Sequence, residues 1–339
     1  MPDASSPDAP SPQTRLTPAL RALLDRVIDY AGYFPPADLS LREALQNYLS
    51  YQQSPTSWLL GRFVVPIDLV DDLDTHRSIF KQSSPFELAV LGTGGRTSNA
   101  FLDALQQDVE TLEAFHERHR DRARAEVLEV PLPPALLEAD IPTARTFFKS
   151  VADHLVVSGV AKLDIFYEVP LDERAADVVP ALVAALSEHN SSRPSPARSV
   201  AGLKIRCGGP DPSYIPSAEH VALAIGRCRD AGVRFKATAG LHHPIRHFKD
   251  AYGRMAHGFL NVFGAAVLAA EHNLDDADLQ AILRDDTANH FRFDKDTFSW
   301  TDLSAQLEAI RYARERLALS FGSCSFEEPR DDLKELELL

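Results

Sequence analysis

The sequence predicts an α/β protein: a single (β/α)8 barrel of the TIM type, with an insertion before its last strand. Three observations support this fold class, namely the number of β-rich runs, their spacing, and the helical periodicity between them. The runs are VIDYAGYF from residue 27, RFVVPI from 62, ELAVLG from 87, EVLEVPL from 126, LDIFYEVP from 163, VAGLKIRC from 200, VRFKATAG from 233 and LALSFGSCSF from 317. Several are apolar on both faces, as expected of strands that are covered on both sides.

The spacing of the runs is that of a repeated βα unit. The first seven runs start 25 to 39 residues apart, which leaves room for one strand, one helix and two loops. Thr17 and Pro18 are a capping residue followed by proline at the first helical position. Residues 103–116 repeat apolar side chains at spacings of three and four, and Ser217 begins a second helical pattern that ends at Gly232.

The last run starts 84 residues after the seventh, which predicts an insertion over residues 272–316. The gap before the last strand contains helical patterns over 257–271 and 275–283, an aromatic segment over 290–300 that could form a hairpin, and a returning helix over 301–316. After strand seven, the insertion would be a wall or lid on the catalytic face, or equally an outer packing element. Residues 17–339 are then one catalytic domain, and the Pro/Ser/Asp-rich residues 1–16 are expected to be a disordered tail.

A doubly wound parallel sheet is the rival architecture for this alternation of strands and helices. Such sheets usually carry the pattern G-x-G-x-x-G directly after a strand, where it binds a dinucleotide. The nearest segment, Gly92-Thr-Gly94-Gly95, lacks the final glycine. The sequence therefore favours the barrel and gives no sign of a dinucleotide cofactor.

The formal net charge of −14 argues against a nucleic-acid or anionic-membrane partner, because either would need a surplus of Lys and Arg. No apolar run approaches the roughly 18 residues of a membrane helix. The N-terminus has no apolar signal segment, and three cysteines do not make a disulfide framework. We therefore expect a cytoplasmic enzyme with a small-molecule substrate, and leave open whether it forms a homo-oligomer.

Reactive residues concentrate at the ends of the last three predicted strands, in LKIRCGG, FKATAGLHHP and SFGSCSFEEP. The carboxyl ends of the strands are where barrel enzymes place their active sites. Charged residues inside such strands are costly unless they are paired or functional. Lys204, Arg206 and Lys236 are therefore the most anomalous residues of the chain.

Two lysines on adjacent strands would each raise the energy of the other's ammonium form. Together with burial, this effect lowers a lysine pKa and leaves a neutral amine that can attack a carbonyl. We therefore predict an imine-forming site with Lys204 and Lys236 as catalytic residues, acting on a small polar or anionic carbonyl or sugar-like substrate. The equal alternative is structural: a lysine pairs with Glu129 or Glu168 in a buried ion network.

Three motifs resemble those of deoxyribose-phosphate aldolase. Lys204-Ile-Arg-Cys-Gly208 resembles K-T-S-T-G of its strand six, Lys236-Ala-Thr-Ala-Gly240-Leu241 resembles K-A-x-G-G-I of its strand seven, and Gly322-Ser-Cys-Ser325 resembles G-x-S-S of its strand eight. The resemblance implies a class I aldolase or a related lyase, with Lys204 as the Schiff-base lysine and Lys236 as the neighbour that depresses its pKa. It also implies that Gly240, Ser323 and Ser325 line an anion or phosphate site.

This chain departs from that family in several places. Arg206 and Cys207 replace small hydroxyl residues, and the predicted third strand, AVLGTGG, has no match for the family's proton-shuttle aspartate. KATAGLHHP, HGFLN and FGSCSFEEP together also resemble a widespread group of uncharacterised bacterial proteins, and that resemblance implies no reaction.

Other polar residues complete the predicted site. Tyr167 and Glu168 alternate on one strand, so only one of them faces the barrel interior, and we expect a carboxylate (Glu168 or Glu129) or His242 to move protons. Arg206 and Ser323 would hold an oxyanion, and His243 and Asn261 would contact substrate.

Two alternatives to the imine site need no reactive lysine. A metal-dependent hydrolase, lyase or isomerase could use Cys207, His242 and Cys324 with zinc or another divalent metal, although no ligand pair has a diagnostic spacing. The chain could also be a non-catalytic binding protein. Adjacent histidines on an extended segment point to opposite sides, so at most one of His242 and His243 would enter a given site.

Overall fold

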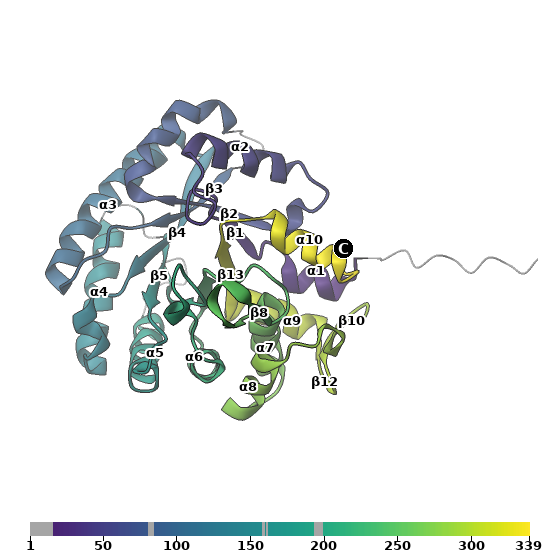
Figure 1. Cartoon of the computed structure of the whole chain (residues 1–339). Helices are drawn as coiled ribbons and strands as arrows, with labels where there is room; N and C mark the ends of the chain where they lie inside the picture. The colour runs from purple at the N-terminus through teal and green to yellow at the C-terminus, as the bar shows by residue number, and fades with distance from the viewer. Residues whose placement is uncertain (1–15, 81–84, 158–159, 161, 193–198) are drawn as a thin grey trace, which may run out of the picture.

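The computed structural model describes residues 16–80, 85–157, 160, 162–192 and 199–339. Its centre is a closed barrel of eight parallel strands in the order β1-β13-β7-β6-β5-β4-β3-β2 (Figure 1). The strands are β1 (Ile28–Tyr30), β2 (Leu60–Pro66), β3 (Phe86–Leu91), β4 (Ala123–Pro131), β5 (Asp164–Val169), β6 (Ala201–Arg206), β7 (Phe235–Thr238) and β13 (Ala318–Ser323). Each overlaps one of the eight predicted runs, and β2, β3 and β4 begin one to three residues earlier than predicted, so the predicted (β/α)8 barrel is confirmed. Residues 1–15 of the predicted tail lie outside the described residues.

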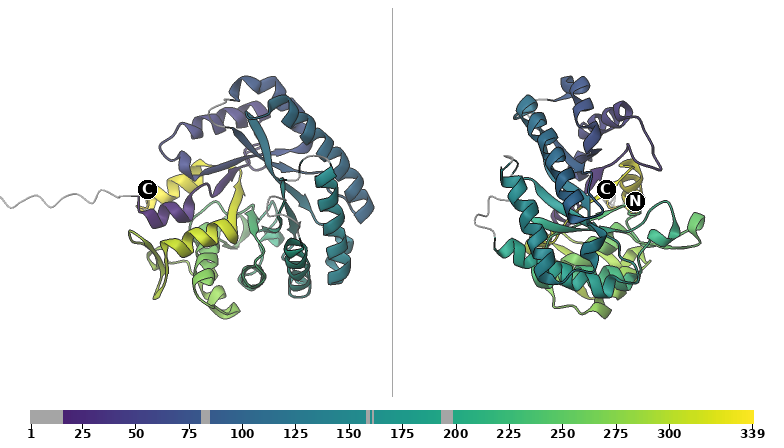
Figure 2. Two further views of the ribbon diagram at one scale, coloured as in Figure 1. Left: turned by 180° about the vertical axis from the view of Figure 1, so that it is seen from behind. Right: turned by 90° about the vertical axis from the view of Figure 1, so that its left-hand side faces the viewer.

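Helices cover the outside of the barrel (Figures 1 and 2). They are α1 (Pro18–Leu24), α2 (Leu41–Gln52), α3 (Ser98–His119), α4 (Ile141–Val157), α5 (Ala175–Ser191), α6 (Ala218–Ala231), α7 (Phe259–Glu271), α8 (Asp276–Arg284), α9 (Leu307–Arg316) and α10 (Glu327–Glu335). The predicted caps are present. The Thr17 side chain accepts a hydrogen bond from the Leu20 amide at 3.1 Å, and Gly232 ends α6 in the left-handed region, at φ 62°.

The segment between β7 and β13 contains five short strands besides its helices. They are β8 (His247–Lys249), β9 (Arg254–Ala256), β10 (Phe291–Phe293), β11 (Thr297–Trp300) and β12 (Leu303–Gln306). The predicted hairpin in the aromatic segment is confirmed, but the predicted helix over 301–316 begins only at Leu307. The reason is that residues 303–306 pair with β11 and extend the hairpin to a three-stranded sheet.

The three-stranded sheet β10-β11-β12 is an outer packing element. It lies against α1, α7 and α9, and the Ala19 amide of α1 donates a hydrogen bond to the Lys295 carbonyl at 3.1 Å. Of the two positions weighed for the insertion, the sheet therefore takes the outer one. The smaller β8-β9 hairpin follows directly on the carboxyl end of β7.

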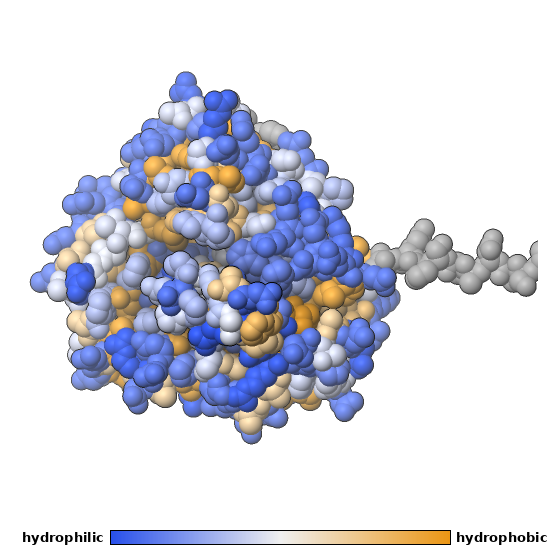
Figure 3. Space-filling model, viewed as in Figure 1, coloured by the Kyte–Doolittle hydropathy of each residue, from blue (hydrophilic) through white to orange (hydrophobic). Residues whose placement is uncertain are grey.

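Side chains alternate between the barrel interior and the layer of helices. Outward side chains join the helices in one large apolar core. The interior contains only a small apolar cluster, formed by Val64, Ala89, Val127 and Phe166. Among the described residues no helix is long and apolar enough to cross a membrane, and the face seen in Figure 3 is mainly hydrophilic with apolar residues scattered over it. The remaining interior positions are largely charged.

Candidate active site

Lys204 and Lys236 lie side by side in the barrel interior. They are direct partners in the register between β6 and β7 and are 4% and 1% exposed. The predicted juxtaposition of the two lysines is therefore confirmed. Burial this deep means that every charge they carry must be compensated by the protein.

One carboxylate compensates both lysines. The Lys204 Nζ lies 2.7 Å from one oxygen of Glu129, and the Lys236 Nζ lies 2.9 Å from the other. Lys204 also contacts Glu168 at 2.9 Å. Burial favours the neutral amine of Lys204, but the two carboxylates outweigh burial and raise its pKa. The expectation that neighbouring charges lower the Lys204 pKa is therefore wrong, because carboxylates separate the two ammonium groups.

The ion network extends through Glu168 towards the carboxyl end of the barrel. It faces the interior as predicted, and Arg206 contacts it at 2.8 Å. Burial raises the Glu168 pKa, but Lys204 and Arg206 outweigh burial and lower it, so the carboxylate stays ionised. The side chains of Arg206 and Glu168 are 32% and 21% exposed, so solvent can reach the network at the carboxyl end of the barrel. The Arg206 guanidinium also lies over the Tyr214 ring, 5.6 Å from its centroid.

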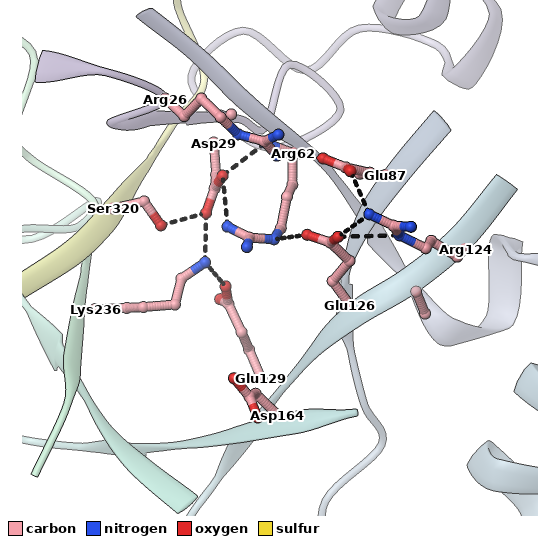
Figure 4. A network of polar contacts seen from close by, with 12 residues as sticks. Arg26, Asp29, Arg62, Glu87, Arg124, Glu126, Glu129, Asp164, Lys236 and Ser320 are labelled. Carbon is pink, nitrogen blue, oxygen red and sulfur yellow. Dashed lines mark hydrogen bonds and ion pairs between the residues drawn. The ribbon is translucent and has the colours of Figure 1, made fainter. Parts of the chain in front are cut away.

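The network also extends towards the amino end of the barrel (Figure 4). Lys236 forms an ion pair with Asp29, which also accepts hydrogen bonds from the Ser320 hydroxyl and the Arg62 amide, each at 2.7 Å. The Arg62 side chain contacts Glu126 at 3.0 Å. Cations and anions then continue to alternate through Arg124, Glu87 and Arg26. Opposite charges therefore meet at every step between the two ends of the barrel.

A second group of polar side chains lies beyond the strands, in the loops after β7 and β13. The Cys324 Sγ is 3.9 Å from Nε2 of His242, whose Nδ1 lies 2.7 Å from a carboxylate oxygen of Glu328 on α10. Burial lowers the pKa of His242, but Cys324 and Glu328 outweigh burial and raise it to about 9. A thiol, an imidazole and a carboxylate in this order match the nucleophile, base and orienting acid of covalent catalysis.

The backbone after β7 directs the two histidines towards α10. Ala239 and Gly240 both adopt positive φ, 56° and 75°. Glycine accepts this conformation, whereas alanine is strained in it by about 1–3 kcal/mol. A Cβ on Gly240 would also lie 2.8 Å from the Cys207 carbonyl oxygen, so the loops after β6 and β7 are in close contact there. Strain held next to such a group of side chains is typical of functional sites.

The two adjacent histidines both contact α10, because the loop after β7 is not the extended strand for which opposite orientations were predicted. His242 contacts Glu328, while Nδ1 of His243 pairs with Asp332 and its ring packs edge-on against His247. Glu328 and Asp332 are four residues apart on α10, so they lie on one face of the helix. The helix therefore holds both histidines, one turn apart.

Several predicted substrate contacts are already used within the protein. The Ser323 hydroxyl donates to the Ser325 carbonyl at 2.7 Å, and the Ser325 hydroxyl accepts from the Glu328 amide at 3.1 Å. The Asn261 amide donates to the carbonyls of Ile282 and Asp285 at 2.8 Å, and its oxygen accepts from the Arg246 amide. Roles for Ser323, Ser325, Gly240, His243 and Asn261 in substrate binding stay predictions.

The alternative metal ligands do not converge. His242 and Cys324 are neighbours, but Cys207 is fully buried and its backbone pairs with β7, and burial raises the pKa of its thiol to about 12. Within the described ranges, no group of three or more His, Cys, Asp or Glu side chains could hold a metal ion. A zinc site needs at least three ligands from the protein, and Cys207 does not join His242 and Cys324 as the third.

Sequence reasoning missed Arg62, Ser320 and Glu328 as parts of these two groups. For Arg62 there was a usable signal, a charged residue at the start of the apolar run RFVVPI. Ser320 and Glu328 gave none, because a single serine in an apolar run is not distinctive and acids are common in the first turn of a helix.

Comparison with known proteins identifies no family for this chain. The chain matches no protein-family model and no curated protein. The assignment of function therefore rests on the geometry of the site.

Replacing Glu129 by Gln is predicted to lower the free energy of unfolding by about 3–5 kcal/mol near neutral pH, because it leaves two buried ammonium groups without their shared anion. Burial raises the Glu129 pKa, but the two lysines outweigh burial and lower it from 4.5 to about 2. A lowered folded-state pKa stabilises the fold above about pH 4.5, and this stabilisation is lost as pH falls towards 2. Urea unfolding of both proteins across this pH range measures the effect.

The control is Glu117→Gln, which removes an exposed carboxylate on α3. We expect it to change stability by less than about 0.5 kcal/mol. A Glu129→Gln protein as stable as this control would contradict the role given to the shared carboxylate.

The pKa of His242, measured by NMR titration, is predicted to be about 9 in the intact protein. In the double variant Cys324→Ala/Glu328→Gln it should fall towards 6.5, because both groups that favour the imidazolium are gone. Because the folded-state pKa is raised, this contact stabilises the fold fully below pH 6.5, and the stabilisation is lost as pH rises through about 9. His116, whose pKa burial lowers, should titrate identically in both proteins. An unchanged His242 titration would contradict the assigned contacts.

Proposed function

We propose that this protein is an enzyme that forms a covalent bond between Cys324 and the carbonyl carbon of a small anionic ester, thioester or amide. The relay from Cys324 through His242 to Glu328 carries this proposal, with contacts of 3.9 and 2.7 Å. The three residues follow β7 and β13, which are neighbouring strands, at the end of the barrel where such enzymes act. The Cys324 side chain is partly exposed, so a substrate can reach it.

The residues account for each proton in an acyl transfer. The reactive form is the ion pair in which the thiol proton already resides on Nε2 of His242, whose pKa of about 9 keeps it protonated near neutral pH, and the thiolate sulfur of Cys324 forms a bond to the carbonyl carbon. When the tetrahedral intermediate collapses, the bond to the leaving group breaks and His242 returns the proton to it. Water then attacks the thioester with His242 as base, which releases the acid and restores the thiol. Glu328 holds the ring and stabilises the imidazolium in both halves.

The neighbouring part of the ion network supports an anionic substrate. Arg206 ends β6, the strand next to β7, and its guanidinium is the most exposed cation of the network near this end. An arginine fork suits a carboxylate or phosphate because it can donate two parallel hydrogen bonds. Lys204 stays charged beneath it and adds positive potential. The overall acidity of the chain does not oppose such a local site.

Imine formation at Lys204, as in class I aldolases, is a second candidate. Lys204 lies beside Lys236 inside the barrel, and Glu168 contacts its amine at 2.9 Å and could accept its proton. The raised Lys204 pKa opposes this chemistry, because the attacking amine must first lose a proton. A thiol must also lose its proton, but the His242 imidazolium beside Cys324 favours the thiolate, and we therefore prefer the thiol mechanism. The resemblance to deoxyribose-phosphate aldolase stays a prediction.

Cys324 is predicted to be the cysteine that iodoacetamide modifies fastest, because an adjacent imidazolium favours the reactive thiolate. His242→Gln should slow this modification by at least about tenfold at pH 7. Peptide mass spectrometry of each cysteine gives the rates. Cys207 and Cys228 are internal controls, since both are fully buried and burial raises the pKa of their thiols. A rate unaffected by His242→Gln would remove the support for the thiol mechanism.

Activated esters with anionic acyl groups should leave an acyl adduct on Cys324 of the intact protein, and Cys324→Ala should leave none. Borohydride treatment with small aldehydes and ketones should leave no adduct on Lys204, because that amine is held in its charged form. Whole-protein and peptide mass spectrometry reads both experiments. A Lys204 adduct absent from Lys204→Met would establish the imine mechanism instead. If neither residue reacts, a non-catalytic binding protein becomes the better interpretation.

A further inference from the structure

Arginines line a cleft at the amino end of the barrel, opposite the candidate active site. The cleft has a volume of about 850 Å³ and lies along α1 and α9, which are neighbours (Figure 1). Seven of its fourteen lining residues are arginines, and only Asp25 and Glu315 are acidic. The chain as a whole has a net charge of −14, whereas the lining of this cleft is positively charged.

The arginines of the cleft differ in how their charges are compensated. Four of them have a carboxylate within 4.0 Å. The other three, Arg311, Arg314 and Arg316, have no such partner among the residues that the structure describes. All three belong to α9. One turn and a half of this helix therefore supplies about three uncompensated positive charges to the cleft.

Arg314 is the most unusual of the three because it is only 8% exposed. Its guanidinium donates hydrogen bonds to the carbonyls of Ala318 and Asp25, which carry no net charge. Its Nε is buried and has no partner within the described part of the chain. A buried cation with no carboxylate in contact is unfavourable, and burial lowers the Arg314 pKa to about 10, which the charges of Asp25 and Asp29 oppose only in part. An anion in the cleft would provide the missing charge.

A second cleft, of about 610 Å³, continues from the first. The two share Arg234, Arg311, Glu315 and Arg316. The second cleft also contains Tyr312, which is 62% exposed. A ligand held by its anionic groups on the shared arginines would therefore have an exposed aromatic ring beside it, on which a planar ring could stack.

We propose that this cleft binds a small molecule that carries two or more phosphate groups. Arginine binds phosphate oxygens through paired hydrogen bonds, and a single phosphate carries less charge than three uncompensated arginines supply. A nucleic acid is disfavoured, because its many charges would meet the acidic remainder of the molecule. Catalysis in such barrels takes place at the carboxyl ends of the strands, so the bound molecule would be a regulator or a stabilising ligand rather than the substrate.

Calorimetric titration of the full chain with pyrophosphate and with ATP, at about 0.05 M salt, tests the proposal. We expect both to bind, and the double variant Arg311→Glu/Arg316→Glu to weaken binding at least about tenfold. The matched control is Arg42→Glu/Arg145→Glu, which makes the same change of net charge with two exposed arginines on α2 and α4. It should change the affinity by less than about twofold.

Comparing pyrophosphate with ATP shows whether the site binds a nucleotide or the phosphate groups alone. Tighter binding of ATP, lost in Tyr312→Ala, would assign the site to a nucleotide, and equal binding would assign it to the phosphate groups alone. Arg314→Met should weaken both ligands while circular dichroism shows that the fold is intact. The proposal is overturned if neither ligand binds, if the control pair weakens binding as much as Arg311→Glu/Arg316→Glu, or if a short DNA duplex binds more tightly through the same arginines.

Discussion

The carboxylate of Glu129, shared between the ammonium groups of Lys204 and Lys236, is the interaction on which the barrel interior depends. All three side chains are at most 5% exposed, so water cannot compensate their charges. Both lysines need Glu129, because removing one partner of a buried ion pair leaves charge that is less well compensated. The shared carboxylate also explains how Lys204 can lie beside a second lysine and still have a raised pKa.

This arrangement gives the barrel an unusual interior. Apolar side chains fill only part of it, and alternating charges fill much of the rest, from Arg206 near one end to Arg26 at the other. Buried ion pairs seldom stabilise a fold better than apolar side chains of the same size. At the carboxyl end the network is exposed through Arg206, and at the amino end Arg26 and Arg62 line the arginine-rich cleft.

The polar groups at the carboxyl end depend on a different part of the chain. Cys324 and His242 follow neighbouring strands, but α10 supplies the acid that orients the imidazole. The backbone after β7 is strained at Ala239 and turns sharply enough to bring His242 to that helix. The barrel thus provides the rigid frame, and two loops and one short helix place the reactive side chains on it. Barrel enzymes commonly place functional side chains on loops at the carboxyl ends of rigid strands.

The sequence by itself determined the eight strands, most helices and the adjacency of Lys204 and Lys236, because these follow from local periodicity and from the order of parallel strands. It also named Glu129 and Glu168 as partners of a lysine in a buried ion network, and both contact Lys204. It could not show that Glu129 is shared with Lys236 or that Asp29 pairs with Lys236. Glu129 and Asp29 come from strands far from Lys236 in the sequence, and only closure of the barrel brings them to it. The sign of the Lys204 pKa shift, the contact of Glu328 with His242 and the gathering of arginines from α1 and α9 were likewise decided by tertiary structure. Electrostatic effects depend on distances across the fold, and no local pattern encodes those distances.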